Sequence, residues 1–314
     1  MSIVLLCSTQ RGKKFLKKLI ELKDRRELVV FSFKEDPWEP PFLEDIRKLA
    51  LEFDAKFFES KNVGKKEFDE FWNSNEIELI LLVNWRYKIP KKIYERAKYG
   101  TFVLHDSLLP KYRGFSPTVW ALINGEDITG VTLFKISEEI DEGKIVDQQI
   151  VPIHSEDNIE SISLKLDQAY LDIFELNYNN LINGNIILKA QDSSKASYTC
   201  KISPEDAIID WSWDTEKIYN LIRAYTFPYP GAYTFLKEKK IKILSARLLE
   251  NPKNYVGNIP GKIVEIIPNE GSIVLTGNGS LLITKVEIDN KIVCAAEVMN
   301  SIKLKLGNYQ NRML

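Results

Sequence analysis

The first half of the chain alternates short, continuously apolar runs with stretches of helical periodicity. The apolar runs predict strands at 3–7, 28–33, 79–83 and 101–104, and the stretches between them predict helices near 13–26, 40–53 and 91–97. Strands that are apolar throughout are typical of a parallel sheet that helices cover on both faces. We therefore predict an α/β domain with an open, Rossmann-like, mostly parallel sheet, whose ligands bind beyond the carboxyl ends of the strands.

The pattern changes after the fourth strand. Ser116 and Pro117 favour the start of a helix, two β-like runs follow at 130–136 and 144–151, and a long amphipathic helix spans about 158–181. Beyond a polar stretch, one helix (214–224) precedes short strands with turn signals at 232–236, 240–249, 261–267, 272–276 and 280–288. Such spacing suggests a small barrel. We expect domains at 1–190 and 202–314, the second a smaller OB-like β-barrel, with a linker at 191–201.

Composition narrows the functional classes. With a net charge of −1, the protein has no overall positive charge that would attract it to nucleic acid or to a membrane. The apolar runs are far shorter than the roughly 20 residues that a membrane-spanning helix needs, and the amino-terminal run resembles a first buried strand more than a signal peptide. We therefore expect a cytoplasmic protein. Cys7, Cys200 and Cys294 form no CxxC pair, so we predict no metal site.

Two histidines narrow the search for an acid–base group that works near neutral pH. His154 lies in a predicted loop, VPIHSED, and is interpreted as a solvated residue. His105 follows an apolar strand and opens HDSLLPKYRG, where the chain becomes polar. This position is the carboxyl end of a strand, where parallel sheets place their chemistry. His105 is therefore the candidate catalytic residue, and the alternative is a histidine that caps the strand by hydrogen bonding.

At this stretch the chain resembles the folate-dependent formyltransferases. Their pattern is Asn-x-His-x-Ser-Leu-Leu-Pro-x-Tyr-Arg-Gly with a downstream Asp-x-Gly, and HDSLLPKYRG and IDEG match it, the latter with Asp141 and Gly143. In the second half, ISPEDAIIDW, IRAYTFPYPGAY and PGKIVEI are similar to the carboxyl-terminal domains of methionyl-tRNA formyltransferase and of the aminoarabinose-modifying enzyme. The resemblance covers nearly the whole chain and is closest in character to sugar-nucleotide N-formyltransferases.

The resemblance implies a formyltransferase fold and 10-formyltetrahydrofolate as co-substrate. It implies that His105 contacts the transferring group, and that Asp141 orients His105 and stabilises its charged form. It also implies a folate-binding edge after the third predicted strand, which the pterin contacts largely through backbone atoms. The residues that it assigns to folate binding are Trp85, Arg86, Tyr87, Ile89, Leu109, Gly114 and Ile140.

One departure from the family pattern concerns the oxyanion. Two residues before the histidine the family has asparagine, and this chain has Val103. Valine has no hydrogen-bond donor, and the loss of one oxyanion donor typically costs about 2.7–4 kcal/mol of transition-state stabilisation. Asn84, at the end of the neighbouring strand, is the candidate substitute and the third predicted catalytic residue. The alternative is a homologue that binds folate without turnover.

The amine acceptor is interpreted from the segment after the second strand. The tRNA enzymes of the family have a basic insertion there, whereas this chain has the acidic, prolyl segment FSFKEDPWEPPFLEDIRK. Because affinity for nucleic acid depends on Lys and Arg contacts to phosphate, this segment favours a nucleotide-linked amino sugar over tRNA. The basic helix at 13–26 keeps tRNA open as an alternative acceptor, although a solvated outer face is the default interpretation of that helix. A homodimer also remains open.

Overall fold

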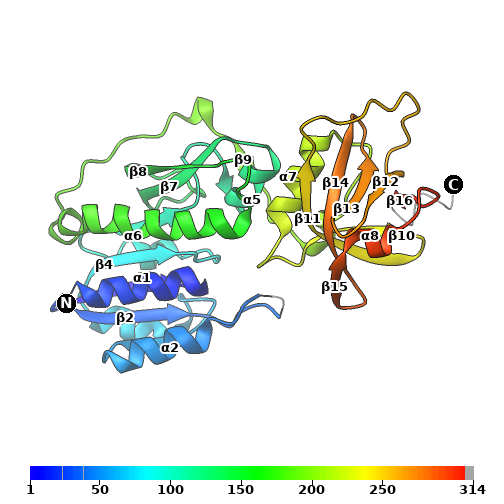
Figure 1. Ribbon diagram of the computed structural model, residues 1–314. Coiled ribbons are helices and arrows are strands. Elements are labelled where there is room, and N and C mark those ends of the chain that lie inside the picture. The colour runs from blue at the N-terminus through cyan, green and yellow to red at the C-terminus, as the bar shows by residue number, and fades with distance from the viewer. Residues whose placement is uncertain (23, 38, 308–314) are drawn as a thin grey trace. The chain divides into compact units, whose positions relative to one another are not determined.

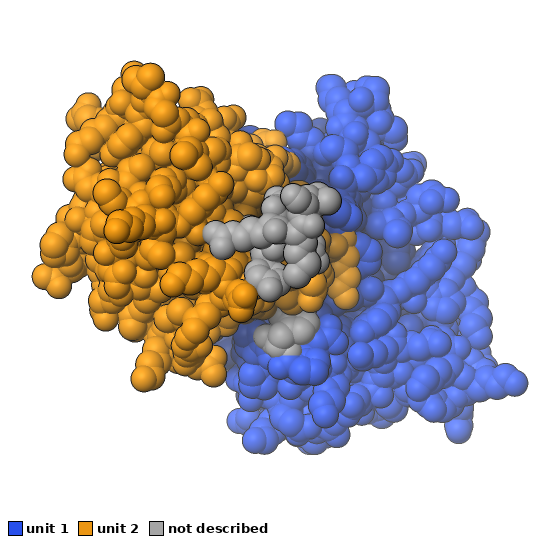
Figure 2. Space-filling view, turned by 90° about the vertical axis from the view of Figure 1, so that its right-hand side faces the viewer, with its two compact units in different colours: residues 1–117, 128–152, 163–200 blue, residues 118–127, 153–162, 201–314 orange. Residues whose placement is uncertain are grey.

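The computed structural model describes residues 1–22, 24–37 and 39–307. They form two compact units, shown in different colours in Figure 2. The first comprises residues 1–117, 128–152 and 163–200, and the second comprises residues 118–127, 153–162 and 201–314. Trp38 of the acidic segment and residues 308–314 of the predicted second domain lie outside the described residues.

The first unit is built on a seven-stranded sheet with the order β3-β2-β1-β4-β5-β7-β8. Strands β2, β4, β7 and β8 of this sheet are labelled in Figure 1. Neighbouring strands from β3 to β5 pair in parallel, and β7 and β8 join as antiparallel strands. The strands are β1 Ser2–Cys7, β2 Glu27–Ser32, β3 Lys56–Glu59, β4 Ile77–Val83, β5 Thr101–His105, β7 Ile128–Lys135 and β8 Ile145–Pro152. This confirms the open, mostly parallel α/β sheet predicted from the continuous apolar runs.

Helices cover both faces of this sheet. They are α1 Thr9–Glu21, α2 Leu43–Glu52, α3 Asp69–Ser74, α4 Lys91–Tyr94 and α6 Ile159–Asn183, with short 3₁₀ turns at Lys66–Phe68 and Ser193–Lys195. Leu6 and Leu82 pack with Trp72 of α3 on one face. On the other face α1 lies against Cys7, because a Cβ added at Gly12 would sit 2.9 Å from the Cβ of Cys7. Among the described residues, no helix combines the length and the apolar character needed to cross a membrane.

Helix α1 begins at Thr9, four residues before the predicted start, and ends at Glu21. Ser8, the preceding residue, has an extended backbone. The basic residues Arg25 and Arg26 therefore follow the helix and do not belong to its face. The early start places Arg11 within the first turn, where it is buried. Helix α1 therefore has a buried arginine in its first turn, ahead of the basic residues for which the sequence predicts a solvated face.

The second unit contains a seven-stranded antiparallel sheet in the order β12-β13-β14-β11-β10-β16, with β15 paired to β14. Its strands are β10 Ala232–Leu236, β11 Lys239–Leu248, β12 Ile263–Ile267, β13 Gly271–Leu275, β14 Ser280–Ile288, β15 Lys291–Cys294 and β16 Leu306–Gly307. Its helical segments are α5 Pro117–Ile123, α7 Thr215–Tyr225 and α8 Ala295–Val298, with a 3₁₀ turn at Pro204–Ala207.

The sheet of the second unit curls toward closure. Its register shifts at Ser245 of β11, and such irregularities bend strands. The two ends of the sheet approach each other, because Lys262 forms an isolated bridge with Lys305 and Leu306 N–H donates to the Gly261 carbonyl at 2.8 Å. This curled sheet confirms the smaller barrel-like domain predicted for the carboxyl-terminal part.

Candidate active site

His105 is the last residue of β5, at the carboxyl edge of the parallel sheet. Its backbone pairs with Thr132 of β7, and the residue before it, Leu104, pairs with Val83 of β4. Asn84 follows Val83 directly, so Asn84 and His105 leave neighbouring strands at the same level of the sheet. Because adjacent strands lie about 4.8 Å apart, the fold brings these two predicted residues together.

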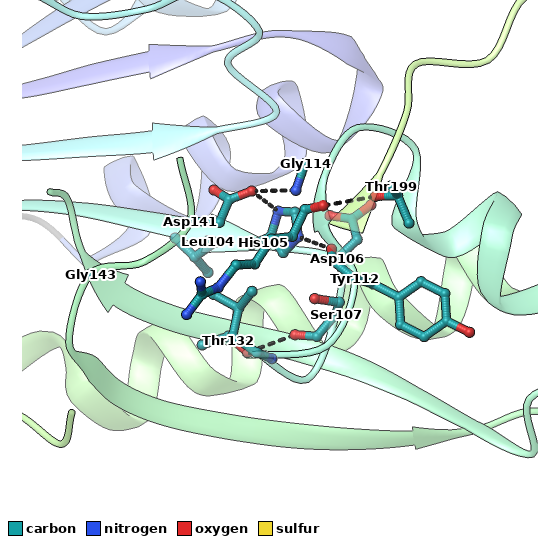
Figure 3. A network of polar contacts seen from close by, with 12 residues as sticks. Leu104, His105, Asp106, Ser107, Tyr112, Gly114, Thr132, Asp141, Gly143 and Thr199 are labelled. Atoms are coloured by element: carbon teal, nitrogen blue, oxygen red, sulfur yellow. Dashed lines mark hydrogen bonds and ion pairs between the residues drawn. The ribbon is translucent and has the colours of Figure 1, made fainter. Parts of the chain in front are cut away.

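His105 and Asp141 also come together in the structure (Figure 3). Nδ1 of His105 lies 3.7 Å from Oδ2 of Asp141, and Nε2 lies 2.9 Å from the backbone oxygen of Tyr112. A carbonyl oxygen can only accept a hydrogen bond, so Nε2 is the donor in this contact. Protonation of Nδ1 would therefore convert the His105–Asp141 contact into an ion pair. The side chains of both residues are mostly buried, at 10% and 15% exposure.

The carboxylate of Asp141 is held in place by backbone groups. Gly114 N–H donates to Oδ2 at 2.8 Å, and Asp141 itself has a left-handed backbone with φ of +55°. Nε2 of Gln191 donates to the carbonyl oxygens of Asp141 and Gly143, each at 2.8 Å. A Cβ at Gly143 would meet the Lys135 oxygen at 1.6 Å, so this turn requires glycine. The Asp-x-Gly pattern thus places the carboxylate opposite the imidazole.

Arg113 is a structural residue of the site. Its side chain has no exposed surface, and the guanidinium donates to Gln191 Oε1 at 2.8 Å, to Glu142 and to the Tyr198 hydroxyl at 3.2 Å. Arg113 and Gly114 form strand β6, which pairs with β9 at Tyr198–Thr199. These contacts give Arg113 a structural role, because they hold this part of the motif in place.

The SLLP loop is anchored to the buried side of β7. The Thr132 hydroxyl donates to the Ser107 carbonyl at 2.6 Å and accepts from Leu109 N–H at 3.1 Å. Gln148 Nε2 donates to the Leu109 carbonyl and to the Thr132 hydroxyl, each at 2.9 Å. Sequence reasoning missed both side chains. The available signal was a polar threonine within the otherwise buried strand ITGVTLFK.

The predicted folate edge has unused backbone groups. Among the described residues, no protein group is hydrogen-bonded to a backbone N–H or C=O of residues 85–89. The rings of Trp85 and Tyr87 pack edge-on against Phe33, at 5.3 and 4.9 Å between centroids, and Arg86 is ion-paired with Glu39. The side chains thus hold this segment in place, while its backbone donors and acceptors are open. Such a segment can form hydrogen bonds to the polar edge of a flat ring.

The remaining predicted folate residues differ in exposure. Ile89 and Leu109 are buried, at 5% and 2% exposure, whereas Ile140 is 65% exposed beside Asp141. Leu109 packs in a small apolar cluster with Phe134 and Ile145. The structure therefore leaves Ile140 accessible to a ligand and shows Leu109 as part of the core beneath the loop.

Val103 and Asn84 differ in the polar groups that they present. Val103 is partly buried and packs against both apolar clusters that flank β5. Asn84 has a φ of +53°, and its Nδ2 donates to the Thr9 hydroxyl at 3.0 Å. Its Oδ1 accepts from Arg11 Nη1 at 3.4 Å, and Ser8 Oγ donates to its backbone oxygen at 2.5 Å. Asn84 therefore presents an oriented amide at the end of β4, whereas the Val103 side chain on the neighbouring strand has no polar atom.

A buried ionic cluster lies next to His105, and sequence reasoning missed it. Arg11 donates through Nη1 to Asp106 and through Nε to Asp167, each at 2.6 Å, and its guanidinium stacks 4.6 Å from the ring centroid of Tyr170. Burial works to raise the pKa of Asp106, but Arg11 and the Tyr170 hydroxyl hold that pKa below its ordinary value. Asp106 is therefore a stable anion beside the histidine.

Comparison with known proteins identifies the class. Residues 1–174 match the family described as "Formyl transferase", and residues 201–303 match "Formyl transferase, C-terminal domain". The chain is 36% identical over 265 residues to a protein named methionyl-tRNA formyltransferase of Thermodesulfovibrio yellowstonii, covering 84% of this chain and 83% of that relative. The chain belongs to the folate-dependent formyltransferase family and is an enzyme of formyl transfer.

Solved structures share the fold at lower identity. An N-formyltransferase of Helicobacter canadensis, in complex with folinic acid and dTDP-3-aminofucose, has a TM-score of 0.66 at 20% identity, over 90% of this chain and 98% of that chain. HypX of Aquifex aeolicus in complex with tetrahydrofolic acid has a TM-score of 0.61 at 20% identity, over 95% of this chain. This chain spans about half of HypX, 46% of its length.

Proposed function

We propose that the protein transfers the formyl group of 10-formyltetrahydrofolate to the amine of a nucleotide-linked amino sugar. The observation that carries the proposal is the His105–Asp141 pair, at the carboxyl edge of a formyltransferase sheet. In the reaction the amine nitrogen bonds to the formyl carbon, and the bond from that carbon to N10 of the folate breaks. The amine loses a proton and N10 gains one, which leaves a formamide and tetrahydrofolate.

The three side chains have distinct roles in this scheme. His105 lies at the transferring group, and in its charged form it stabilises the oxyanion that develops on the formyl oxygen through its positive charge, because its two ring nitrogens face Tyr112 and Asp141. Asp141 orients His105 and stabilises that charged form. Asn84 supplies the amide donor that Val103 lacks, since an amide has two N–H groups and Thr9 takes one of them.

The folate would lie along residues 85–89. The open backbone groups of this segment support the proposal, because a pterin ring has donors and acceptors along one edge. Trp85, Arg86, Tyr87 and Ile89 would frame the ring, and Gly114 and Ile140 would close the site near His105, with Leu109 supporting the loop from the core. The Helicobacter structure contains folinic acid, which supports a folate as a ligand of this fold.

The acceptor assignment depends on the acidic segment after β2. Its acids are engaged locally: Glu35 accepts from Leu43 N–H at 3.2 Å, Glu39 pairs with Arg86, and Asp45 pairs with Lys13 at 2.8 Å. The segment has more acidic than basic residues, which disfavours contacts to phosphates and so favours a small acceptor. The complex of the Helicobacter relative with dTDP-3-aminofucose supports a sugar nucleotide.

Methionyl-tRNA is the second candidate acceptor, favoured by the 36% identity to the Thermodesulfovibrio relative. The deciding experiment incubates the pure protein with 10-formyltetrahydrofolate and either a panel of nucleotide-linked amino sugars or initiator methionyl-tRNA. Mass spectrometry of the products shows which amine gains a formyl group. Transfer to a sugar supports the proposal, and salt-sensitive transfer to the tRNA alone overturns the acceptor assignment. Folate binding without transfer to any of these amines would mean that the acceptor belongs to another class.

A further inference from the structure

The ionic cluster around Arg11 is hydrogen-bonded to the residues on both sides of His105. The Tyr170 hydroxyl contacts the carbonyl oxygen of Leu104, the residue before the histidine, at 3.1 Å. The same hydroxyl is hydrogen-bonded to the carboxylate of Asp106, the residue after the histidine. Arg11 holds the other oxygen of that carboxylate at 2.6 Å. His105 is thus clamped between two anchored neighbours.

Arg11 also determines which way the Asn84 amide faces. A guanidinium can only donate hydrogen bonds, so the amide oxygen of Asn84 must be the end that faces Nη1 of Arg11. The nitrogen end then faces the Thr9 hydroxyl, which accepts one N–H at 3.0 Å. A neutral residue that can both donate and accept hydrogen bonds, placed at position 11, would also allow the Asn84 amide to turn by 180°. The Arg11 cation excludes that second orientation, because it can only donate.

The gain in stability from this buried ionic cluster is too small to explain its presence. Arg11 is 8% exposed, and a buried ion pair often contributes no more stability than apolar residues of similar volume. The planar fork of arginine reaches Asp106, Asp167 and Asn84 from one group, which the single ammonium of a lysine cannot do. The geometry therefore suits alignment of the reaction centre more than bulk packing.

We propose that Arg11 is a positioning residue for formyl transfer, which fixes His105 through Asp106 and aims the Asn84 amide at the formyl oxygen. This inference rests on the proposed function. Arg11 touches neither substrate in this scheme and acts only through these two neighbours.

The first test compares kinetic constants of Arg11→Lys and Asp106→Asn with those of the wild type. Misplacement of a reacting group by about 1 Å costs on the order of 100-fold, so kcat should fall roughly 10- to 100-fold for both variants. The KM for folate should change much less, because the binding edge at 85–89 is untouched. Lys14→Met is the matched control: Lys14 also pairs with Asp167, at 2.6 Å, and its kinetics should match the wild type.

The second test needs no turnover. The chain has two histidines, so imidazole NMR spectra contain one set of ring signals for His105 and one for His154. Arg11→Lys and Asp106→Asn should shift the His105 signals, because they change the position of its neighbours, while the His154 signals stay fixed as the internal reference. An unchanged His105 signal in both folded variants overturns the positioning role, even if the wild type proves inactive on every amine.

A double-mutant cycle separates the two branches of the proposal. If Arg11 acts partly through Asn84, Arg11→Lys should lower kcat less in an Asn84→Ala background than in the wild type. Equal losses in both backgrounds would overturn the proposal that Arg11 acts through Asn84.

If Arg11→Lys does not fold, Tyr170→Phe replaces it, since it removes the hydroxyl that contacts Leu104 and Asp106. Wild-type kcat in the folded Tyr170→Phe and Asp106→Asn variants would overturn the clamp on His105.

Discussion

Asp141 lies opposite His105 because Gly114, nine residues after the histidine, binds the same carboxylate oxygen that faces the imidazole. Oδ2 of Asp141 accepts the Gly114 N–H at 2.8 Å and lies 3.7 Å from Nδ1 of His105. One backbone donor thus connects the two parts of the motif. The carboxylate is oriented before any substrate arrives, which is the arrangement that catalytic sites use to limit reorganisation.

Asp141→Asn should preserve the fold and lower turnover. The amide is nearly isosteric and can still accept from Gly114, but it removes the charge beside His105. We expect kcat to fall by about 10²- to 10⁴-fold, the range typical of an acid–base partner. Steady-state rates and the free energy of unfolding, measured together, check this. Unchanged kcat in a folded variant would contradict the assigned role of the carboxylate.

Val103→Asn restores the amide of the family pattern. We expect it to raise kcat or leave it little changed, because the position borders the reaction centre and lacks a donor in the native chain. Asn84→Ala should lower kcat by about 10²- to 10³-fold if its amide is the substitute donor. Formyl-transfer rates of both variants, with folding checked by circular dichroism, test the pair. Wild-type rates in Asn84→Ala would exclude Asn84 as the donor.

Gly143→Ala should destabilise the protein. The added Cβ would lie 1.6 Å from the Lys135 backbone oxygen, so the turn that presents Asp141 must shift. We expect a loss of more than about 2 kcal/mol in the free energy of unfolding. Gly257→Ala is the matched control, because its Cβ would meet nothing within 4 Å, and it should change stability by less than about 0.5 kcal/mol. Equal effects on urea unfolding would refute this account of the turn.

The ion pair of Asp106 should make stability depend on pH. Its pKa is lower in the folded protein than the value of about 3.9 in an unfolded chain. Asp106 therefore stabilises the fold fully above pH 4, and this contribution is lost as the pH falls through the folded pKa. Asp106→Asn should reduce the free energy of unfolding by roughly 3 kcal/mol at pH 7, and less toward pH 3. A difference from wild type that is constant across this range would contradict the prediction.

The sheet could be predicted because each buried strand is a continuous apolar run. Leu79–Val83 was clear from five consecutive apolar residues, and the structure extends this strand to Ile77. The strand Lys56–Glu59 was missed because its four residues, KFFE, lie at the sheet edge with charged ends. The short β6 and β9 were missed because a two-residue parallel pair has no local signal.

The reaction pair could be predicted from the motif, but its supports could not. His105 and Asp141 stand in recognisable local patterns, whereas Gln191 acts through partners about 50 residues away along the chain. Arg11 precedes a basic stretch whose charges alternate with apolar residues, and that pattern favours a solvated face. Only the tertiary fold brings Asp106 and Asp167 to either side of its guanidinium.

The most direct test of the central claim is a single-turnover measurement with His105→Gln and the wild type. Each enzyme is mixed in excess with 10-formyltetrahydrofolate and the nucleotide-linked amino sugar that the wild type formylates best. We predict that the wild type transfers the formyl group, and that His105→Gln binds folate but transfers it about 10²- to 10⁴-fold more slowly. Equal transfer rates for the two folded proteins would contradict a reaction centre built on His105 and Asp141.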